Sequence, residues 1–234
     1  MIDSVALRTR LADVRARIAR AAGRAGRDPA SIRLVAVSKT VSADHVRAAA
    51  DLGQIDFGEN KVQDALQKMD ALAGVPIRWH LVGHLQSNKA RKTARFDMIH
   101  SIDSAVLMAR VDDAARAAGR SIDALVQVDL AREPTKHGAR EEELAGLFDA
   151  ARSAAAIHVR GLMLLPPAVD DPEAARPHFR ELRAVRDRLL AGGADPSMLT
   201  DLSMGMSHDF ELAVEEGATL VRVGSAIFGQ RVKP

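Results

Sequence analysis

Short runs of apolar and β-branched residues alternate along this chain with longer segments whose apolar residues recur at helical spacing. The short runs have the pattern of buried strands. They are Ile32–Lys39, Ile55–Asn60, Ile77–Gly83, Met98–Asp103, Ala124–Leu130, Val159–Leu165, Leu199–Gly205 and Leu220–Phe228. The helical spacing predicts helices at Asp44–Leu52, Val62–Leu72, Ser104–Ala118, Glu141–Ala156, Glu173–Ala191 and Asp209–Glu216. An amphipathic helix over Ser4–Ala25, ending at Gly26, precedes the first strand.

Eight strands separated by helices indicate a parallel α/β fold. Eight strands also close a (β/α)8 barrel, and 234 residues lie within the size range of that fold. A doubly wound open sheet is the competing architecture, but it normally has a glycine-rich turn after its first strand. Here that turn reads Ser38-Lys39-Thr40-Val41, without glycine. We therefore expect one domain over residues 1–234, a single TIM-type (β/α)8 barrel with an extra N-terminal helix.

Composition limits the classes to which the chain can belong. With 47% hydrophobic and 27% charged residues and a mean hydropathy of −0.08, it resembles a soluble globular protein without a membrane span. The charged N-terminus lacks a signal-peptide pattern, so we expect a cytoplasmic location. The absence of cysteine excludes disulfides and thiolate metal sites. Basic and acidic residues are interspersed around a net charge of +2, and aromatic residues make up only 3%, so we expect no nucleic-acid partner.

Lys39 ends the first predicted strand. Because strand side chains alternate between two faces, Lys39 shares a face with Val35 and Val37 and places an ammonium group above an apolar column. Such a lysine is commonly the first solvated residue of a loop. The alternative is a lysine partly shielded from water, which is a competent nucleophile for Schiff-base chemistry. Lysine is scarce beside arginine in this chain, which favours the second interpretation.

The second and third predicted strands also end in polar residues. Asn60 follows Gly58, which would let a ligand approach the backbone, but Asn60 is equally suited to cap the next helix. His80 and His84 lie four residues apart on one face of a strand, and the sequence indicates no third ligand near them. A pocket wall or a hydrogen-bonding role therefore fits this pair better than a metal site, and we expect no metal.

The last two predicted strands carry the most specific pattern. Ser207 follows the seventh strand as a candidate N-cap, in a turn whose backbone N–H groups can bind an anion. Arg222 and Gly224 share a face of the eighth strand, and Ser225 follows. A buried arginine needs an acceptor, and phosphate sites in barrels commonly use the loops after strands seven and eight. A structural arginine beside an ordinary turn is the alternative. Barrel closure would bring strand eight beside strand one, so that Lys39 faces the same mouth.

Longer motifs surround these positions. They are Val35–Lys39, Phe57–Gln63, His80–Lys89, Gly161–Met163, Leu202–Ser207 and Val221–Gly229. In this order they span nearly the whole chain, and they resemble the pyridoxal-phosphate homeostasis protein family, whose members are stand-alone barrels similar to the N-terminal domain of alanine racemase. The resemblance implies pyridoxal 5′-phosphate (PLP) as cofactor. An amine near a phosphate site, with a polar partner for the ring, is what this cofactor requires.

The resemblance also implies a role for each candidate residue. The cofactor would be held as a Schiff base on Lys39, with Asn60 beside the ring and Arg222 facing the pyridine nitrogen. The phosphate would be held by Ser207, Gly224 and Ser225.

Some positions depart from the family pattern or leave a choice open. Ser203 or the Gly205 backbone are alternatives to Ser207 at the phosphate. Asp129 stands where the family suggests Asn, and His137 occupies the middle of Lys136-His137-Gly138. These departures leave the cofactor assignment unchanged.

Two chemical arguments favour a carrier over an enzyme. A racemase needs a base on each face of its substrate, and the second base of alanine racemase is a tyrosine, whereas this sequence contains no tyrosine. Arginine does not give up its proton, so Arg222 would leave the pyridine nitrogen unprotonated and the ring a weak electron sink. We expect a protein of intracellular PLP homeostasis that stores, delivers or buffers the cofactor. As partners we expect PLP and transient contacts with apo PLP enzymes, with the chain a monomer or weak dimer.

Two other functions remain open. One is a weak PLP-dependent amino-acid racemase or another PLP enzyme. The other is a phosphate-binding barrel enzyme without PLP, in which Lys39 forms a Schiff base with a sugar phosphate.

Overall fold

Eight parallel strands form a closed barrel in the computed structural model, which describes residues 3–130, 137–167 and 169–229. Neighbouring strands along the chain pair with one another, and β1 pairs with β8 to close the ring. The strands are β1 (Arg33–Val37), β2 (Asp56–Glu59), β3 (Arg78–Leu81), β4 (Met98–Ile102), β5 (Ile122–Val128), β6 (Ile157–Leu164), β7 (Asp201–Ser203) and β8 (Leu220–Val223). The predicted TIM-type barrel is confirmed, and the open sheet is wrong.

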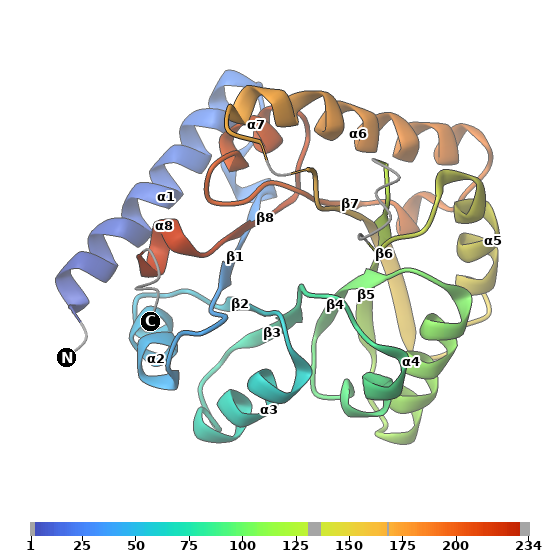
Figure 1. Ribbon diagram of the computed structural model, residues 1–234, viewed down its shortest axis with the longest axis horizontal. Helices are drawn as coiled ribbons and strands as arrows, with labels where there is room; N and C mark the ends of the chain where they lie inside the picture. The colour runs from blue at the N-terminus through green and yellow to red at the C-terminus, as the bar shows by residue number, and fades with distance from the viewer. Residues whose placement is uncertain (1–2, 131–136, 168, 230–234) are drawn as a thin grey trace.

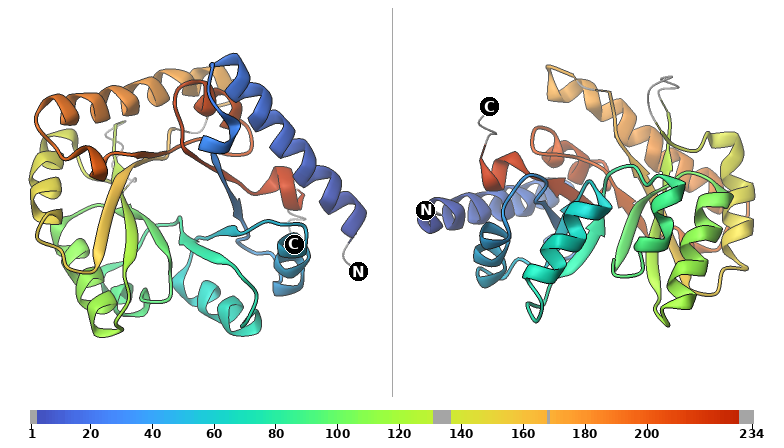
Figure 2. Two further views of the ribbon diagram at one scale, coloured as in Figure 1. Left: turned by 180° about the vertical axis from the view of Figure 1, so that it is seen from behind. Right: turned by 60° about the horizontal axis from the view of Figure 1, so that its bottom comes forward.

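Helices surround the barrel (Figures 1 and 2). The α-helices are α1 (Ser4–Arg24), α2 (Ala43–Asp51), α3 (Val62–Ala71), α4 (Ala105–Ala117), α5 (Glu141–Ala151), α6 (Arg176–Ala191), α7 (Phe210–Glu215) and α8 (Ser225–Phe228). Short 3-10 helices occur at η1 (Pro29–Ser31), η2 (Ser87–Lys92), η3 (Pro172–Ala175) and η4 (Pro196–Met198). The extra N-terminal helix, α1, is present as expected and packs on α7 and α8 (Figure 1).

The strand side chains divide into an outer and an inner layer. On β1, Leu34 and Ala36 point outward into the large apolar cluster beneath the helices, whereas Val35 and Val37 point into the barrel. On β8, Val221 points outward and Leu220 inward. This period of two is the alternation from which the position of Lys39 was inferred.

The ends of several elements differ from the prediction. The eighth predicted strand, Leu220–Phe228, is wrong in its second half: β8 ends at Val223, and Ser225–Phe228 is the helix α8. Gly224 breaks the strand because its backbone, at φ −117° and ψ −76°, leaves the extended region. The helix predicted over Glu141–Ala156 ends earlier, at Ala151, since the next residues turn into β6.

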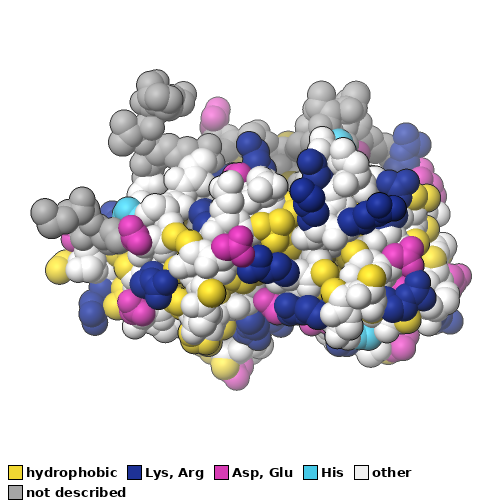
Figure 3. Space-filling model, turned by 90° about the horizontal axis from the view of Figure 1, so that it is seen from below, with side chains coloured by type: hydrophobic (Ala, Val, Ile, Leu, Met, Phe, Trp, Pro, Cys, Tyr) yellow, Lys and Arg dark blue, Asp and Glu magenta, His cyan; other side chains and the backbone are white. Residues whose placement is uncertain are grey.

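The distribution of charge on the surface agrees with the interspersed basic and acidic residues of the sequence. On the face seen in Figure 3, basic and acidic side chains are mixed. Within the described part of the chain, no helix has the length and apolar character needed to cross a bilayer.

Asp112 of α4 anchors that helix to the start of β6. Its Oδ1 accepts hydrogen bonds from the backbone N–H groups of Ala156 and Ile157, at 2.6 and 2.9 Å. Burial raises the pKa of Asp112, but these hydrogen bonds outweigh burial and lower the pKa overall. The carboxylate is therefore bound in its charged form.

We predict that Asp112→Ala lowers the free energy of unfolding by about 2 to 3 kcal/mol at neutral pH, because hydrogen bonds to a charged acceptor are lost. Urea unfolding measures this. Because the folded-state pKa is lowered, the contribution is present above the unfolded pKa of about 3.9 and is lost as the pH falls through the folded value. The neighbouring Asp113→Ala, which removes only an exposed pair with Arg116, is the control. Equal losses in the two variants would contradict the prediction.

Candidate functional site

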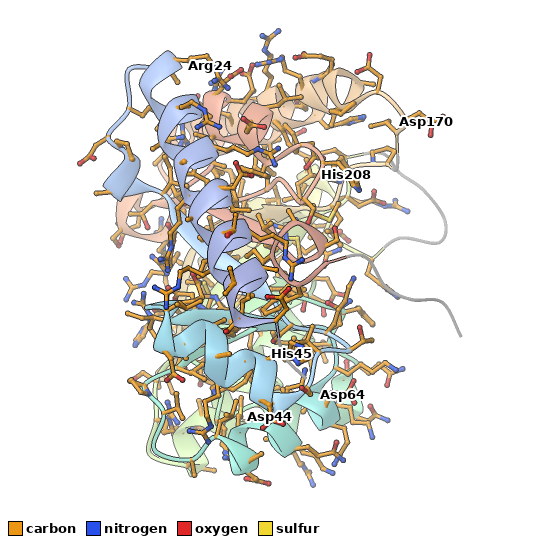
Figure 4. The ribbon with its side chains drawn as sticks, turned by 90° about the vertical axis from the view of Figure 1, so that its left-hand side faces the viewer. Arg24, Asp44, His45, Asp64, Asp170 and His208 are labelled. Atoms are coloured by element: carbon orange, nitrogen blue, oxygen red, sulfur yellow. The ribbon has the colours of Figure 1, made fainter. Side chains whose placement is uncertain are left out.

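One cavity of about 890 Å³ opens at the carboxyl ends of the barrel strands. Its walls come from the segments that follow β1, β2, β3, β6, β7 and β8. Figure 4 shows His45 of α2 and His208, between β7 and α7, on the same side of the barrel, and both line this cavity. All six residues singled out in the sequence also line it: Lys39, Asn60, Ser207, Arg222, Gly224 and Ser225.

Lys39 enters the cavity wall from the end of β1. The register between β1 and β8 sets Val35 opposite Arg222, so both strands end at the same mouth. Thr40, the residue after Lys39, has φ +65°, which turns the chain sharply away from the strand direction. Lys39 is half-buried, rather than the fully solvated loop residue of the alternative interpretation.

A buried ion pair supports the backbone behind Lys39. Lys68 Nζ of α3 lies 2.6 Å from Glu59 Oε1 and donates to the carbonyl oxygen of Ser38, also at 2.6 Å. The hydroxyl of Ser38 donates to the same Glu59 oxygen. Glu59 is fully buried, and its Oε2 has no hydrogen-bond partner among the described residues. This pair fixes the last residue before Lys39 to both β2 and α3.

Asn60 lies in the cavity wall, and Lys61 is the N-cap position of α3. The alternative that Asn60 caps this helix is therefore wrong. Its backbone is held closely by β3, because a Cβ atom on Gly83 would stand 2.3 Å from the Asn60 carbonyl oxygen. Only glycine permits this approach.

Ser207 connects the two loops that follow β7 and β8. Its Oγ accepts from the backbone N–H groups of Gly224 and Ala226, at 3.1 and 3.4 Å. The predicted N-cap role of Ser207 is wrong, because α7 begins after Asp209. The carboxylate of Asp209 instead accepts from the N–H of Met206 and closes the turn that contains Ser207. Burial raises the pKa of Asp209, and this effect is larger than the lowering by that hydrogen bond and by the charge of Arg222.

The two alternatives to Ser207 lie outside the cavity lining. Ser203 is fully buried below the mouth and contacts Arg222 and His100. The carbonyl oxygen of Gly205 accepts from the backbone N–H of Arg222 within the barrel wall. Of the three candidates, Ser207 alone borders the cavity.

Arg222 is 3% exposed and borders the cavity from the barrel interior. Its Nη1 donates to Ser203 Oγ at 2.5 Å and its Nη2 to the carbonyl oxygen of Leu164 at 2.8 Å. Burial lowers the pKa of Arg222 to about 10, although the negative charge of Asp209 acts to raise it. The guanidinium therefore remains protonated at neutral pH, and since arginine has five N–H donors, others remain for a ligand.

The two histidines of β3 have separate environments. His80 is buried inside the barrel in hydrogen bonds, as the sequence suggested. His84 lies at the mouth near Asp103 and His137, so the expectation that no third candidate ligand lies nearby is wrong. The rings of His84 and His137 stack at 3.5 Å with an interplanar angle of 9°. The contact between the two imidazoles is therefore a ring stack, and the expectation that the protein holds no metal stays a prediction.

The departures on the fifth strand lie close to this stack. The backbone N–H of Asp129 donates to the carbonyl oxygen of Ala139, and Gln127 Nε2 donates to that of His137. Lys136 lies outside the described residues. His45, His208, Lys68 and Asp209 carry no specific signal in the sequence. His45 and Asp209 are the second and first residues of predicted helices, where polar residues are ordinary.

Comparison with known proteins identifies the family. Residues 9–232 match the family model "Alanine racemase, N-terminal domain". The pyridoxal phosphate homeostasis protein of Aquifex aeolicus is 40% identical over 223 residues, covering 95% of this chain and 97% of that protein. Its counterpart in Pseudomonas aeruginosa is 41% identical over 94% of each chain. The chain therefore belongs to the alanine racemase N-terminal domain family, and within it to the pyridoxal phosphate homeostasis proteins.

Solved structures agree with this assignment. PipY of Synechococcus elongatus with PLP bound superposes with a TM-score of 0.84 at 38% identity, covering 95% of this chain and 100% of PipY. PipY without PLP gives 0.85 at 39% identity, with the same coverage. Alanine racemase of Corynebacterium glutamicum, at 19% identity and a TM-score of 0.70, shares the fold over 98% of this chain and 62% of its own.

We predict that Lys68→Met destabilises the protein by about 3 to 5 kcal/mol, because it leaves the charge of buried Glu59 without its partner. Urea unfolding is the measurement. Adding Glu59→Gln to the same chain should recover part of the loss, since a neutral amide replaces the uncompensated carboxylate. The exposed Lys61→Met is the matched control and should change stability by less than about 0.5 kcal/mol. If the double variant is no more stable than Lys68→Met, the pair does not act as described.

Proposed function

We propose that this chain binds PLP in the cavity at the barrel mouth, as a Schiff base on Lys39, and stores, delivers or buffers the cofactor. The observation that carries the proposal is the meeting of three chemical groups in one cavity: the amine of Lys39, the guanidinium of Arg222 and the polar turn around Ser207. Relatives at about 40% identity bear the name pyridoxal phosphate homeostasis protein, and PipY has been solved with PLP bound, which supports the same ligand here.

The lining residues suit the parts of this cofactor. PLP carries an aldehyde that reacts with an amine, a pyridine nitrogen that accepts hydrogen bonds, and a phosphate. In the proposed complex Lys39 supplies the amine, and Arg222 donates to the pyridine nitrogen from the barrel interior. Asn60 lies beside the ring.

The phosphate is assigned to the other end of the cavity. There the hydroxyl of Ser207 joins the loops after β7 and β8, and Gly224 and Ser225 line the wall. A Cβ atom on Gly224 would lie 3.1 Å from the carbonyl oxygen of Val37, so glycine lets the loop after β8 pack closely against β1 beside the cavity. The two loops are also those that most often hold phosphate in this fold.

Arg222 favours holding the cofactor over activating it. When bound, PLP stabilises carbanions best with a protonated pyridine nitrogen. A guanidinium that stays protonated at neutral pH offers that nitrogen donors only. The 234 residues also contain no tyrosine, the second base of alanine racemase. A weak PLP enzyme using another base remains the alternative.

We further propose that residues 1–234 act as one PLP-binding unit with transient contacts to apo PLP enzymes.

We predict that Lys39→Ala abolishes covalent capture of PLP, because it removes the only amine assigned to the cofactor. The protein is mixed with PLP, reduced with borohydride and digested, and mass spectrometry locates the adduct. The wild type and the control Lys61→Ala should carry it on Lys39. An adduct on another lysine of Lys39→Ala, at the wild-type yield, would refute the assignment. A wild type without adduct or visible absorbance would favour the sugar-phosphate enzyme.

We predict that the PLP-loaded protein exchanges the α-hydrogen of alanine with D₂O no faster than free PLP does. The physical reason is the donor-only environment around the pyridine nitrogen. Proton NMR of L- and D-alanine measures the exchange. A rate at least about a hundredfold above that of free PLP, the usual scale of assistance by one positioned base, would favour the weak enzyme.

A further inference from the structure

The interior of this barrel contains an unbroken line of buried polar side chains. Barrel interiors are normally filled by branched apolar residues, because an unpaired polar group is costly there. Here five polar residues from five strands share the interior with the apolar cluster: Asp56 of β2, His80 of β3, His100 of β4, Ser203 of β7 and Arg222 of β8. Each is at least nine-tenths buried.

Each member of the line is hydrogen-bonded to the next. Arg222 Nη1 lies 2.5 Å from Ser203 Oγ, and Ser203 Oγ lies 2.9 Å from His100 Nδ1. His100 Nε2 is 2.9 Å from His80 Nδ1, and His80 Nε2 is 2.9 Å from Asp56 Oδ1. The line runs from the cavity wall to the first residue of β2, at the opposite end of the strands. We call these five residues the interior chain.

The two ends of the interior chain fix the direction of every hydrogen bond in it. Arginine can only donate, and an ionised carboxylate can only accept. Burial raises the pKa of Asp56, but the hydrogen bonds from His80 and Arg78 and the charge of Arg78 lower it, and the overall shift is downward. Asp56 is therefore ionised at neutral pH, and His80 must donate to it from Nε2.

With both histidines neutral, the remaining bonds follow in one direction. His80 Nδ1 then accepts from His100 Nε2–H. His100 Nδ1 accepts from the hydroxyl of Ser203, and Ser203 Oγ accepts from Arg222. Both imidazoles are therefore Nε2–H tautomers, and every donor along the line meets an acceptor.

A charged His80 would break this match. It would donate to His100 from Nδ1, and His100 would donate to Ser203, so that the hydroxyl would accept twice. In the described part of the chain Ser203 Oγ contacts only His100 and Arg222, so its hydrogen would have no acceptor. Burial is the largest cause that lowers the pKa of His100 well below its usual value, and the positive charges of Arg222 on β8 and Arg33 on β1 lower it further.

We propose that Ser203, His100 and His80 are positioning residues that lock the orientation of the Arg222 guanidinium, with Asp56 at the far end of the barrel fixing the polarity of the line. Each link has one donor and one acceptor, so the guanidinium cannot rotate without leaving a buried partner unsatisfied. Its orientation at the cavity is thus set from inside the barrel, before any ligand binds. The consequence for PLP rests on the proposed function.

The first test needs no cofactor. Nitrogen-15 NMR of the apo protein at neutral pH should show His80 and His100 with their hydrogen on Nε2 and not on Nδ1. The two Nη nitrogens of Arg222 should give separate signals, because rotation of the guanidinium is blocked. Asp56→Asn, which permits donation in either direction, and Ser203→Ala should average these signals. Arg78→Gln removes another partner of Asp56 without touching the interior chain, and should leave the signals separate.

The second test uses PLP. Ser203→Ala should weaken PLP binding about tenfold and shift the absorption band of the bound cofactor, since the Arg222 donors are no longer held. Arg78→Gln should retain the wild-type band. Circular dichroism checks that each variant is folded, and Asp56→Asn is the second variant should Ser203→Ala fail to fold.

The outcomes separate this proposal from the proposed function. His80 protonated on both nitrogens, or Arg222 signals that stay separate in both Ser203→Ala and Asp56→Asn, would overturn the positioning role. An unchanged band and affinity in a folded Ser203→Ala would do the same. A wild type that fails to bind PLP refutes the proposed function alone, and the apo spectra still decide on the interior chain.

Discussion

Pairing of β1 with β8 is the contact on which the site depends. In this register Val35 lies opposite Arg222, so the end of β1 that carries Lys39 and the strand that carries Arg222 reach the same mouth. A slip of one residue would turn Arg222 toward the helices and Val223 into the barrel. The outward Leu34 and the inward Val35 oppose such a slip, because each fits only its own layer.

The second constraint is the cost of a charged group inside the barrel. Arg222 occupies a place where an aliphatic side chain would pack more favourably. Two observations explain how the charge is tolerated: the guanidinium donates to Leu164 and Ser203, and the hydrogen bonds beyond Ser203 lead to the ionised Asp56. The charge of Arg222 and the counter-charge of Asp56 are thus joined through Ser203 and two imidazoles. On the positioning role proposed above, the apolar packing lost at Arg222 is balanced by a defined orientation of its guanidinium.

Features that depend on local periodicity could be predicted from the sequence. The number and order of the strands, the inward face of Lys39 and the amphipathic α1 all follow from spacings of two or 3.6 residues. The predictions were wrong where contacts with segments distant in the sequence determine the local structure. Ser207 fits the pattern of an N-cap, yet its hydroxyl accepts from Gly224 and Ala226, seventeen and nineteen residues away.

Pairs of residues that come into contact only in the folded barrel could not be predicted from the sequence either. Glu59 and Lys68 pair between a strand and the following helix, a spacing that no helical or strand period marks. His84 meets His137 because β3 and the segment after β5 open toward the same mouth. Likewise β8 reads as continuous from Leu220 to Phe228, because apolar residues recur beyond Gly224, but the backbone turns at that glycine and α8 begins.

These features share one property: the groups at the mouth are held by buried partners that belong to the protein. Lys39 follows a residue tied to Lys68 and Glu59, Asn60 is pressed against Gly83, and Arg222 is held from below. Binding therefore has little freedom to remove in the backbone next to Lys39 and at Asn60 or in the side chain of Arg222, which lowers the entropic cost of taking up a ligand. If Arg222 faces a ring nitrogen, as in the proposed function, a guanidinium that keeps its proton and its orientation would hold that nitrogen without donating a proton to it. This is the physical basis on which we propose a site that retains its cofactor.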